Sequence, residues 1–239
     1  MVTVAIVGPD GAGKSTVVRQ VVAALPFPAR SVYMGVNLEA SRTMLPTTRL
    51  ALAVKHARGG RADMTGRTGL GPGDPGRRRR GRLAGLRADL RMANWIAEEW
   101  FRQAIAAVHQ RRGRVVVFDR HFFCDYYAHD VAPRAAGRPL ASRVHGYNLG
   151  RLYPRPDLVV LLDAPADVLH ARKGEGTVES IEARRHEYLA QADLFREFVV
   201  VDARQPTAAV IDEVRDRIVD FVRGVPPVRA ATPIRGAGR

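Results

Sequence analysis

The segment Gly8-Pro9-Asp10-Gly11-Ala12-Gly13-Lys14-Ser15-Thr16 follows the pattern G-x-x-x-x-G-K-[ST], and the residues on either side of it fit the same interpretation. The apolar, β-branched run at 2–7 predicts a buried parallel strand. Residues 15–25 carry apolar side chains at helical spacing, and Pro26 ends that pattern. A strand, a glycine-rich loop and a helix in this order predict a loop whose backbone N–H groups bind phosphate.

Each part of this loop has an expected contribution to nucleotide binding. The glycines let backbone N–H groups turn inward, and the helix that follows adds the positive end of its dipole. Lys14 is expected to reach the β- and γ-phosphates, and the Ser15 hydroxyl to ligate Mg²⁺. The sequence lacks the Asn-Lys-x-Asp signature of GTPases, so we expect ATP and Mg²⁺ as cofactors. The expected nucleotide-binding residues are Gly8, Asp10, Gly11, Ala12, Gly13, Lys14, Ser15 and Thr16.

Length and composition predict a single enzyme-sized domain. The chain has 239 residues, of which 46% are hydrophobic, enough for one sizeable core. No apolar stretch approaches the roughly 20 residues of a membrane span. The sequence enters a strand directly, without the pattern of a signal peptide, and Cys124 is the only cysteine. We therefore expect a cytoplasmic protein in which Cys124 is a buried, small apolar residue.

Two stretches hold most of the net charge of +14. Residues 55–91 carry eleven cationic side chains against three aspartates, and residues 222–239 carry four arginines and no acid. We interpret 58–82 as a basic, flexible insertion and 225–239 as a disordered tail, with 1–224 forming one domain. The insertion is a solvated loop, a surface for an anionic membrane or nucleic acid, or a cover for an anionic substrate, and the sequence leaves these three open.

Strand and helix patterns alternate along the chain, which predicts an α/β fold with a parallel sheet covered by helices. Strands are expected at 2–7, 31–34, 114–118, 156–163 and 198–202. Helices are expected at 15–25, 41–56 with a break near Pro46, 83–110, 178–197 and 207–222, and Pro165 is expected to open another.

The long helix at 83–110 has an apolar face to which both tryptophans of the chain belong. We expect Trp95 and Trp100 to pack in the core. The members of this face are Trp95, Ile96, Trp100, Ile105 and Val108. No helix face is identified that demands a partner.

Asp119-Arg120-His121 follows directly on the third strand. In an open parallel sheet, residues at the carboxyl ends of strands converge on the ligand crevice. Asp119 is therefore expected to face Lys14 and Ser15 and to hold Mg²⁺, directly or through water. Arg120 is expected to contact a phosphate through two hydrogen bonds.

The phosphate loop, Asp119-Arg120-His121 and the stretch 156–173 together resemble thymidylate kinases and their thymidylate kinase-like relatives among the nucleoside monophosphate kinases. The resemblance covers most of 1–25 and 114–222. It implies a three-layer P-loop fold, with a five-stranded parallel sheet flanked by helices and a mobile lid. The implied reaction is transfer of the γ-phosphoryl group of ATP to an acceptor, with Mg²⁺. Because the family is often dimeric, a homodimer is a further expectation.

The resemblance also implies roles for single residues. Lys14 matches the donor site, Asp10 matches an acidic residue that faces the sugar of the acceptor, and Arg120 matches an arginine that contacts the acceptor phosphate. The lid begins at 172–176, and Arg172 is the natural candidate for a catalytic lid arginine. The alternatives in and near the lid are Lys173, Arg184 and Arg185.

The sequence also departs from thymidylate kinases where these read their acceptor. Residues 34–39 replace an Arg-Glu-Pro motif, and Ala128-His129 stands in place of a Tyr-Gln pair. Lost polar contacts of this kind change specificity strongly, so we expect a different acceptor. The chain is more similar to divergent kinase-like proteins linked to cell-surface glycan or natural-product pathways.

Two kinds of acceptor remain open. A phosphorylated acceptor would need cations to dock it, such as Arg120 with Arg42 or Arg49. A hydroxyl acceptor would need a carboxylate that orients it and takes its proton, such as Asp10 or Glu39. Further residues expected near the crevice are His121, His129, His145, Tyr147 and Asn148.

We therefore predict an ATP-dependent phosphotransferase that acts on a small phosphate- or sugar-bearing acceptor, such as a nucleotide, a nucleoside or a sugar derivative. The alternative is a nucleotide-dependent switch whose basic loop at 58–82 docks on a membrane or nucleic acid.

Overall fold

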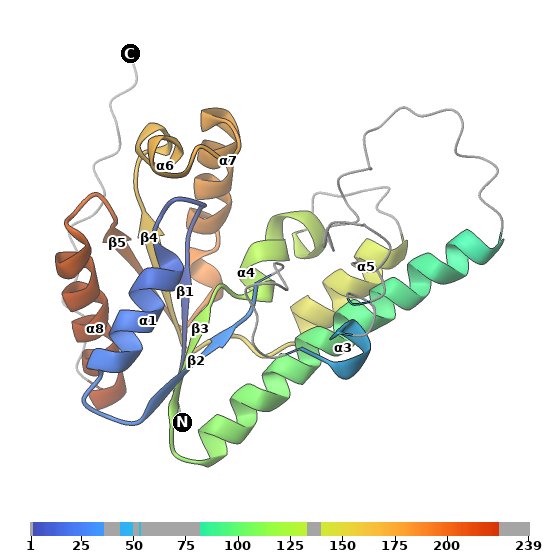
Figure 1. Cartoon of the computed structure of the whole chain (residues 1–239), viewed down its shortest axis with the longest axis horizontal. Coiled ribbons are helices and arrows are strands. Elements are labelled where there is room, and N and C mark those ends of the chain that lie inside the picture. The colour runs from blue at the N-terminus through green and yellow to red at the C-terminus, as the bar shows by residue number, and fades with distance from the viewer. Residues whose placement is uncertain (1, 36–43, 50–52, 54–81, 133–139, 225–239) are drawn as a thin grey trace.

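A computed structural model describes residues 2–35, 44–49, 53, 82–132 and 140–224, without the side chains of 82–89, 91 and 141. Five parallel strands form one sheet in the order β2-β3-β1-β4-β5 (Figure 1). The strands are β1 (Thr3–Val7), β2 (Ala29–Tyr33), β3 (Val115–Asp119), β4 (Leu158–Asp163) and β5 (Glu197–Asp202). The predicted fold class, an α/β fold with five parallel strands flanked by helices, is confirmed.

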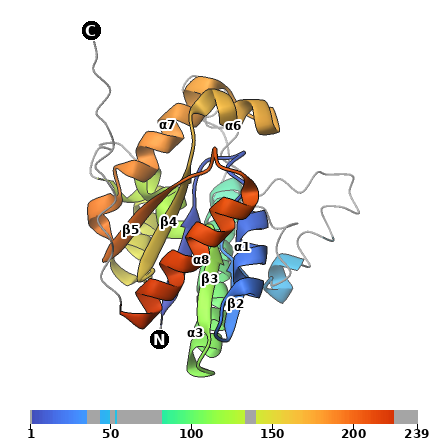
Figure 2. The same ribbon diagram turned by 90° about the vertical axis from the view of Figure 1, so that its left-hand side faces the viewer.

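The helices cover both faces of this sheet and its carboxyl end (Figures 1 and 2). They are α1 (Lys14–Ala24), α3 (Arg82–Arg111), α4 (Phe122–Tyr126), α5 (Leu140–Tyr147), α6 (Ala166–Lys173), α7 (Val178–Leu189) and α8 (Thr207–Arg223). Single turns of π-helix, η3 (Tyr127–Val131) and η4 (Asn148–Leu152), follow α4 and α5, and the 3-10 turn η5 (Ala192–Leu194) follows α7. None of the helices in the described ranges is long and apolar enough to cross a membrane.

The element boundaries test the sequence patterns. Pro165 opens α6 as predicted. The helix predicted at 178–197 is wrong in length, because α7 ends at Leu189 and η5 leads into β5. The charged residues around that junction keep a helical spacing in the sequence, although α7 does not continue there. Of the predicted helix at 41–56, residues 46–49 are helical, and the rest lies mostly outside the described residues. The predicted insertion at 58–82 and tail at 225–239 also lie outside, apart from Arg82 at the start of α3.

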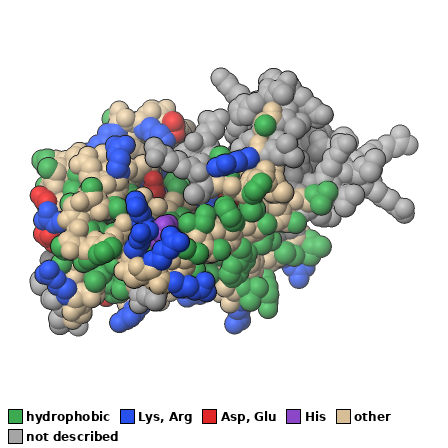
Figure 3. All heavy atoms as spheres, turned by 60° about the horizontal axis from the view of Figure 1, so that its bottom comes forward, with side chains coloured by type: hydrophobic (Ala, Val, Ile, Leu, Met, Phe, Trp, Pro, Cys, Tyr) green, Lys and Arg blue, Asp and Glu red, His purple; other side chains and the backbone are tan. Residues whose placement is uncertain are grey.

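The long helix α3 packs against the sheet on one side only. Trp95 meets Phe122 edge to face, with ring centroids 6.1 Å apart, as expected of a core aromatic residue. The core prediction is only partly right for Trp100, which contacts Tyr153 but is 39% exposed, and Val108 is 41% exposed. Figure 3, which looks onto the bottom of Figure 1, shows hydrophobic side chains gathered on the surface of the half that contains α3.

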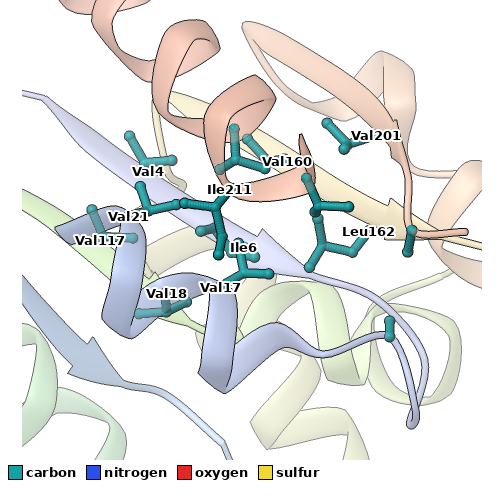
Figure 4. Close-up of a cluster of buried hydrophobic side chains, with 14 of the residues drawn as sticks. Val4, Ile6, Val17, Val18, Val21, Val117, Val160, Leu162, Val201 and Ile211 are labelled. Carbon is teal, nitrogen blue, oxygen red and sulfur yellow. The ribbon is translucent and has the colours of Figure 1, made fainter. Parts of the chain in front are cut away.

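The sheet has a separate hydrophobic core on each face, because successive side chains of a strand point to opposite sides. Val4 and Ile6 of β1 point toward α1 and α8, where they pack with Val17, Val21 and other aliphatic side chains (Figure 4). Ala5 and Val7 of the same strand point toward α3, α4 and η4. Both cores are built on fully buried strands, which explains the continuous apolar runs in the sequence.

The first core gives a stability prediction. Ile218 of α8 is fully buried, so Ile218→Ala should lower the free energy of unfolding by about 2–5 kcal/mol. Val200→Ala on the exposed face of β5 is the control and should cost less than about 1 kcal/mol. Urea unfolding followed by circular dichroism measures both, and equal losses would contradict this packing.

Candidate active site

The phosphate loop joins β1 to α1 and lies against the carboxyl end of β4. Gly8 and Gly11 have φ angles of 148° and 89°, in the range that favours glycine. A Cβ atom at Gly8 would lie 2.4 Å from the carbonyl oxygen of Leu162, and one at Gly11 would lie 2.4 Å from that of Leu169. Close backbone contacts therefore require glycine at Gly8, the first glycine of the motif, and also at Gly11. The loop ends at Gly13, where α1 begins with its N-terminus toward the crevice.

Lys14 is held inside this loop. Its side chain is only 5% exposed, and Nζ donates a 2.6 Å hydrogen bond to the Pro9 carbonyl. Burial lowers the pKa of Lys14 to about 7; the Arg120 charge also lowers it, whereas Asp10 opposes both. A phosphate group at Lys14 would add negative charge and favour the ammonium form, which is the behaviour expected of a phosphate-binding lysine.

Asp10 and Arg120 face each other across the crevice and form an ion pair. Arg120 Nη2 donates a 2.6 Å hydrogen bond to Asp10 Oδ1. Arg120 has a φ of 69°, the only positive value among the described residues other than glycine, and its N–H donates to the carbonyl of Ile6. This strained turn aims the side chain toward the loop. Burial raises the pKa of Asp10, but Arg120 and Lys14 together hold it near 2, so the carboxyl is ionised.

Ser15 and Asp119 lie together, as predicted for a Mg²⁺ site. The Ser15 hydroxyl donates a hydrogen bond to the Asp119 carboxylate, which offsets part of the rise in pKa that burial causes. Asp119 Oδ1 is buried and has no partner within the described parts of the chain. One hydroxyl and one carboxylate with an unused oxygen fit Mg²⁺, which binds few protein groups and takes its other ligands from phosphates and water. Ser15 and Asp119 would hold the ion.

The two adjacent cations at the expected start of the lid lie in different surroundings. Arg172, the predicted catalytic arginine, donates to the Ala203 carbonyl at 2.8 Å, and the structure does not bring it to the phosphate loop. Lys173, an alternative in the sequence analysis, has Nζ 3.6 Å from Asp10 Oδ1 and 2.8 Å from Glu175 Oε2. Lys173 is therefore the described lid cation that contacts Asp10 of the phosphate loop.

The other two lid candidates fasten α7 to neighbouring elements. Arg185 binds both carboxylate oxygens of Asp163, at 2.7 and 2.8 Å, at the carboxyl end of β4. Arg184 donates to the carbonyl oxygen of Asp125 in α4. Tyr188 donates to the buried Asp125 carboxylate at 2.7 Å, and the negative charge of Asp125 raises the pKa of Arg120. Asp125 thus supports the charge of Arg120. The sequence did not predict this role.

Glu98 and Arg102 support the end of β2, a role that the sequence did not predict. Arg102 is fully buried and donates to Glu98 and to the carbonyl oxygens of Tyr33 and Gly35. Glu98 in turn accepts from the Leu45 N–H at 2.9 Å. Their spacing of four residues within a helix of mixed composition is the one signal that would have pointed to this pair.

Two of the histidines expected near the crevice are structural. His121 is fully buried between Phe118 and Tyr153, and burial lowers its pKa to about 3, so the ring is neutral. His145 bridges two buried carboxylates, with Nδ1 2.7 Å from Asp130 and Nε2 2.8 Å from Glu99. Burial opposes the charged form, but these two hydrogen bonds raise the pKa of His145 to about 9.

The remaining members of that set do not line the phosphate loop either. Asn148 is buried and accepts a hydrogen bond from Trp100 Nε1, whereas His129 and Tyr147 are exposed. Cys124 is buried, as predicted. Glu39 and Arg42 lie outside the described residues, so their expected roles stay predictions.

Comparisons with known proteins find similarity among solved structures. No protein-family model matches this chain, and no curated protein matches it. Among solved structures, it is similar to deoxyadenosine kinase from M. mycoides with the products dCMP and a flexible dCDP bound. Identity is 13%, coverage is 92% of this chain and 99% of that chain, and the TM-score is 0.49. The same protein with bound dATP matches at 14% identity, with coverage of 92% and 100% and a TM-score of 0.49.

Lys14 gives the sharpest prediction for this site, because the chain has only three lysines, Lys14, Lys55 and Lys173. With ¹³C-labelled lysine, one side-chain NMR signal should titrate with a pKa near 7 and disappear in Lys14→Met, while that of Lys173 stays above the ordinary value. Addition of ATP should raise the pKa of Lys14. Three ordinary lysine titrations would contradict the buried geometry.

Asp10 gives a second prediction on the same signal. Because the Asp10 carboxylate stabilises the Lys14 ammonium, Asp10→Asn should lower the pKa of Lys14 further below 7. Asp202→Asn is a matched control, since Asp202 lies at the end of β5 and its carboxylate pairs with Arg204. The titration should be unchanged in this control.

Proposed function

We propose that this protein is an ATP-dependent phosphotransferase that transfers the γ-phosphoryl group to a small acceptor. The observation that carries the proposal is the joint placement of Lys14, Ser15 and Asp119 at the phosphate loop with the Asp10–Arg120 pair opposite. A P-loop alone supports nucleotide binding. The added arginine and carboxylate give the site groups that an acceptor needs, which supports a kinase of the thymidylate kinase-like kind.

The roles follow from the geometry. The loop N–H groups and Lys14 would bind the β- and γ-phosphates of ATP, and Ser15 and Asp119 would hold Mg²⁺, which neutralises phosphate charge when bound. Arg120 would stabilise charge on the transferring group, where a single preorganised donor is worth about 100-fold or more in rate. Lys173 would add a second cation from the lid, and the catalytic role of Arg172 stays a prediction.

The Asp10–Arg120 pair favours an acceptor that presents a hydroxyl group. Arg120 already has a carboxylate partner and would also contact the transferring group, so an acceptor phosphate would compete with both for Arg120. A hydroxyl could instead donate to Asp10, whose ionised carboxylate is half-exposed toward the crevice. A carboxylate with a pKa near 2 is a weak base before transfer, so its contribution is to orient the hydroxyl. Nucleosides and sugars fit this requirement better than nucleoside monophosphates.

The rival function, a nucleotide-dependent switch, rests on the basic stretch at 58–82. This stretch lies outside the described residues except for Arg82. ATP binding without turnover of any acceptor would favour it.

The test is ADP release from Mg-ATP with a panel of nucleosides, nucleoside monophosphates, sugars and sugar phosphates. We expect turnover with a hydroxyl acceptor, and Arg120→Ala should lower kcat by about 100-fold or more. Arg204→Ala is the matched control, because Arg204 is exposed and pairs with Asp202. Full turnover in Arg120→Ala would contradict the proposed role of Arg120, and turnover only with phosphorylated acceptors would contradict the preference for a hydroxyl.

The lid gives a separate prediction. Lys173→Ala should lower kcat at least about tenfold, because it removes positive charge beside the transferring phosphate. Arg172→Ala should have a smaller effect, since Arg172 is bonded to the Ala203 carbonyl. The opposite ranking, measured in the same ADP-release assay, would assign the catalytic lid cation to Arg172.

A further inference from the structure

One end of the molecule, opposite the phosphate loop, collects arginine side chains. All five strands are parallel, so all of them begin at this end, which we call the amino end of the sheet. The helices α3 and α8 run back from the carboxyl end and finish here, at Arg111 and Arg223 (Figure 1). Residues at the start of a strand or at the end of these helices therefore lie at the same end of the molecule, whatever their separation in the sequence.

The densest group of these arginines lies where α3 ends beside β2 and β3, and we call it the arginine corner. It consists of Arg30 on β2, Arg111 and Arg112 at the end of α3, and Arg114 just before β3. Arg114 is half-buried and the other three are exposed. Within the described ranges, none of the four pairs with a carboxylate. The dipole of α3 explains cations at its own end, but it does not explain Arg30, which lies on a strand.

His109, in the last turn of α3, lies within the positive field of this corner. Arg114 Nη1 is 3.2 Å from His109 Nδ1. Burial lowers the pKa of His109, and the charges of three arginines of the corner lower it further, with no carboxylate of the described chain opposing them. Because arginine keeps its proton at any physiological pH, the charge of the corner can be neutralised only by an anion from outside the described chain.

Apolar side chains border the arginine corner on two sides. The loop at 26–28, Pro-Phe-Pro, joins α1 to β2, and both of its prolines are exposed. Its last carbonyl accepts a hydrogen bond from the N–H of Val115, which follows Arg114. On α3, Val108 is 41% exposed and lies one turn before Arg112. Figure 3, which looks toward this end, shows Lys and Arg side chains with a histidine among them and hydrophobic side chains beside them.

This combination fits an anionic lipid surface better than a nucleic acid. Arginine binds phosphate, which both of them present. Apolar side chains beside the cations gain contacts in the interfacial region of a bilayer, whereas the backbone of a nucleic acid offers phosphate and sugar. Contact at the amino end would also leave the crevice, at the carboxyl end of the sheet, open to solution.

The remainder of the amino end carries charges of both signs. Its arginines are Arg155, Arg196 and Arg223, and its acids are Asp157, Asp193, Glu197 and Asp220. Since these charges nearly cancel, the arginine corner supplies the net positive charge of this end.

We propose that the amino end of the sheet, centred on the arginine corner, docks on a membrane surface that contains anionic phospholipid. The arginines would bind lipid phosphate groups, and the loop at 26–28 and Val108 would enter the interfacial region beside them. The proposal is independent of the phosphotransferase function and of the basic stretch at 58–82.

The first test measures co-sedimentation of the full chain with vesicles of phosphatidylcholine, with and without phosphatidylglycerol. The wild type should bind only the anionic vesicles, and added salt should release it. Arg30→Gln/Arg112→Gln should weaken binding by about 25-fold, because each arginine near an anionic surface contributes about fivefold. Both side chains are exposed, so the variant should keep its far-ultraviolet circular dichroism.

The matched control is Arg204→Gln/Arg215→Gln, which has the same net charge as the first variant. Arg204 follows β5 at the carboxyl end of the sheet, and Arg215 lies in the middle of α8. Both are more than a Debye length from a membrane at the amino end, so binding should stay close to that of the wild type.

The second test locates the contact with a fluorescent label. Cys124 is the only cysteine and is buried, so Val108→Cys adds a single exposed thiol that an environment-sensitive dye can label. Anionic vesicles should shift the emission of this dye to shorter wavelength. Ala208→Cys, at an exposed position in the first turn of α8 at the carboxyl end, is the matched control and should show no shift.

A wild type that does not bind the anionic vesicles at low salt would overturn the proposal. Equal weakening in the two double variants would mean that net charge alone drives binding, and undiminished binding in both would place the contact outside the arginine corner. A dye at position 108 that does not respond while the protein binds would also overturn it. Binding to duplex DNA but not to vesicles, lost in Arg30→Gln/Arg112→Gln, would assign the corner to nucleic acid instead.

Discussion

The parallel pairing of β1 with β3 is the constraint on which the candidate site depends. In this register Ile6 lies beside Asp119, and the Arg120 N–H donates to the Ile6 carbonyl one position further on. The phosphate loop and the Asp119-Arg120 segment therefore leave the sheet side by side at its carboxyl end, although more than 100 residues separate them. Fully buried strands hold this register, since a shift of one residue would turn the apolar side chains of each strand to the wrong core.

Charge compensation around Asp10 is the second feature of the site. Its Oδ1 lies 2.6 Å from Arg120, 3.6 Å from Lys173 and 3.9 Å from Lys14. Three cations, from α1, from α6 and from the turn after β3, thus share one carboxylate. Phosphate oxygens placed among them would compete for the same partners, so ATP would change which cations Asp10 binds. Burial and the neighbouring charges together set the low pKa of Asp10 and the lowered pKa of Lys14.

The fold and the donor half of the site could be predicted from sequence because local patterns encode them. The run at 2–7, the glycine loop and the helix after it are contiguous, and Asp119 directly follows a strand. Residues whose roles arise from contacts over long sequence separations were missed. Asp125 accepts hydrogen bonds from Tyr188 and Arg184, and Arg102 donates to the backbone at the end of β2. No local sequence pattern predicts such contacts. Arg172 and Lys173 are adjacent in sequence, and only the direction of the end of α6 shows which of them faces Asp10. Trp100 was likewise expected in the core but is 39% exposed, because apolar periodicity alone does not show which side of an apolar helix meets the sheet.

The measurement that tests the account most directly is calorimetric titration of ATP with Mg²⁺ into the wild type and into Lys14→Ala. The account predicts binding by the wild type and a loss of at least about tenfold in affinity in the variant, because Lys14 supplies a buried cation at the phosphate loop. Equal binding by both proteins, or no binding by the wild type, would contradict the assignment of this loop as the ATP site.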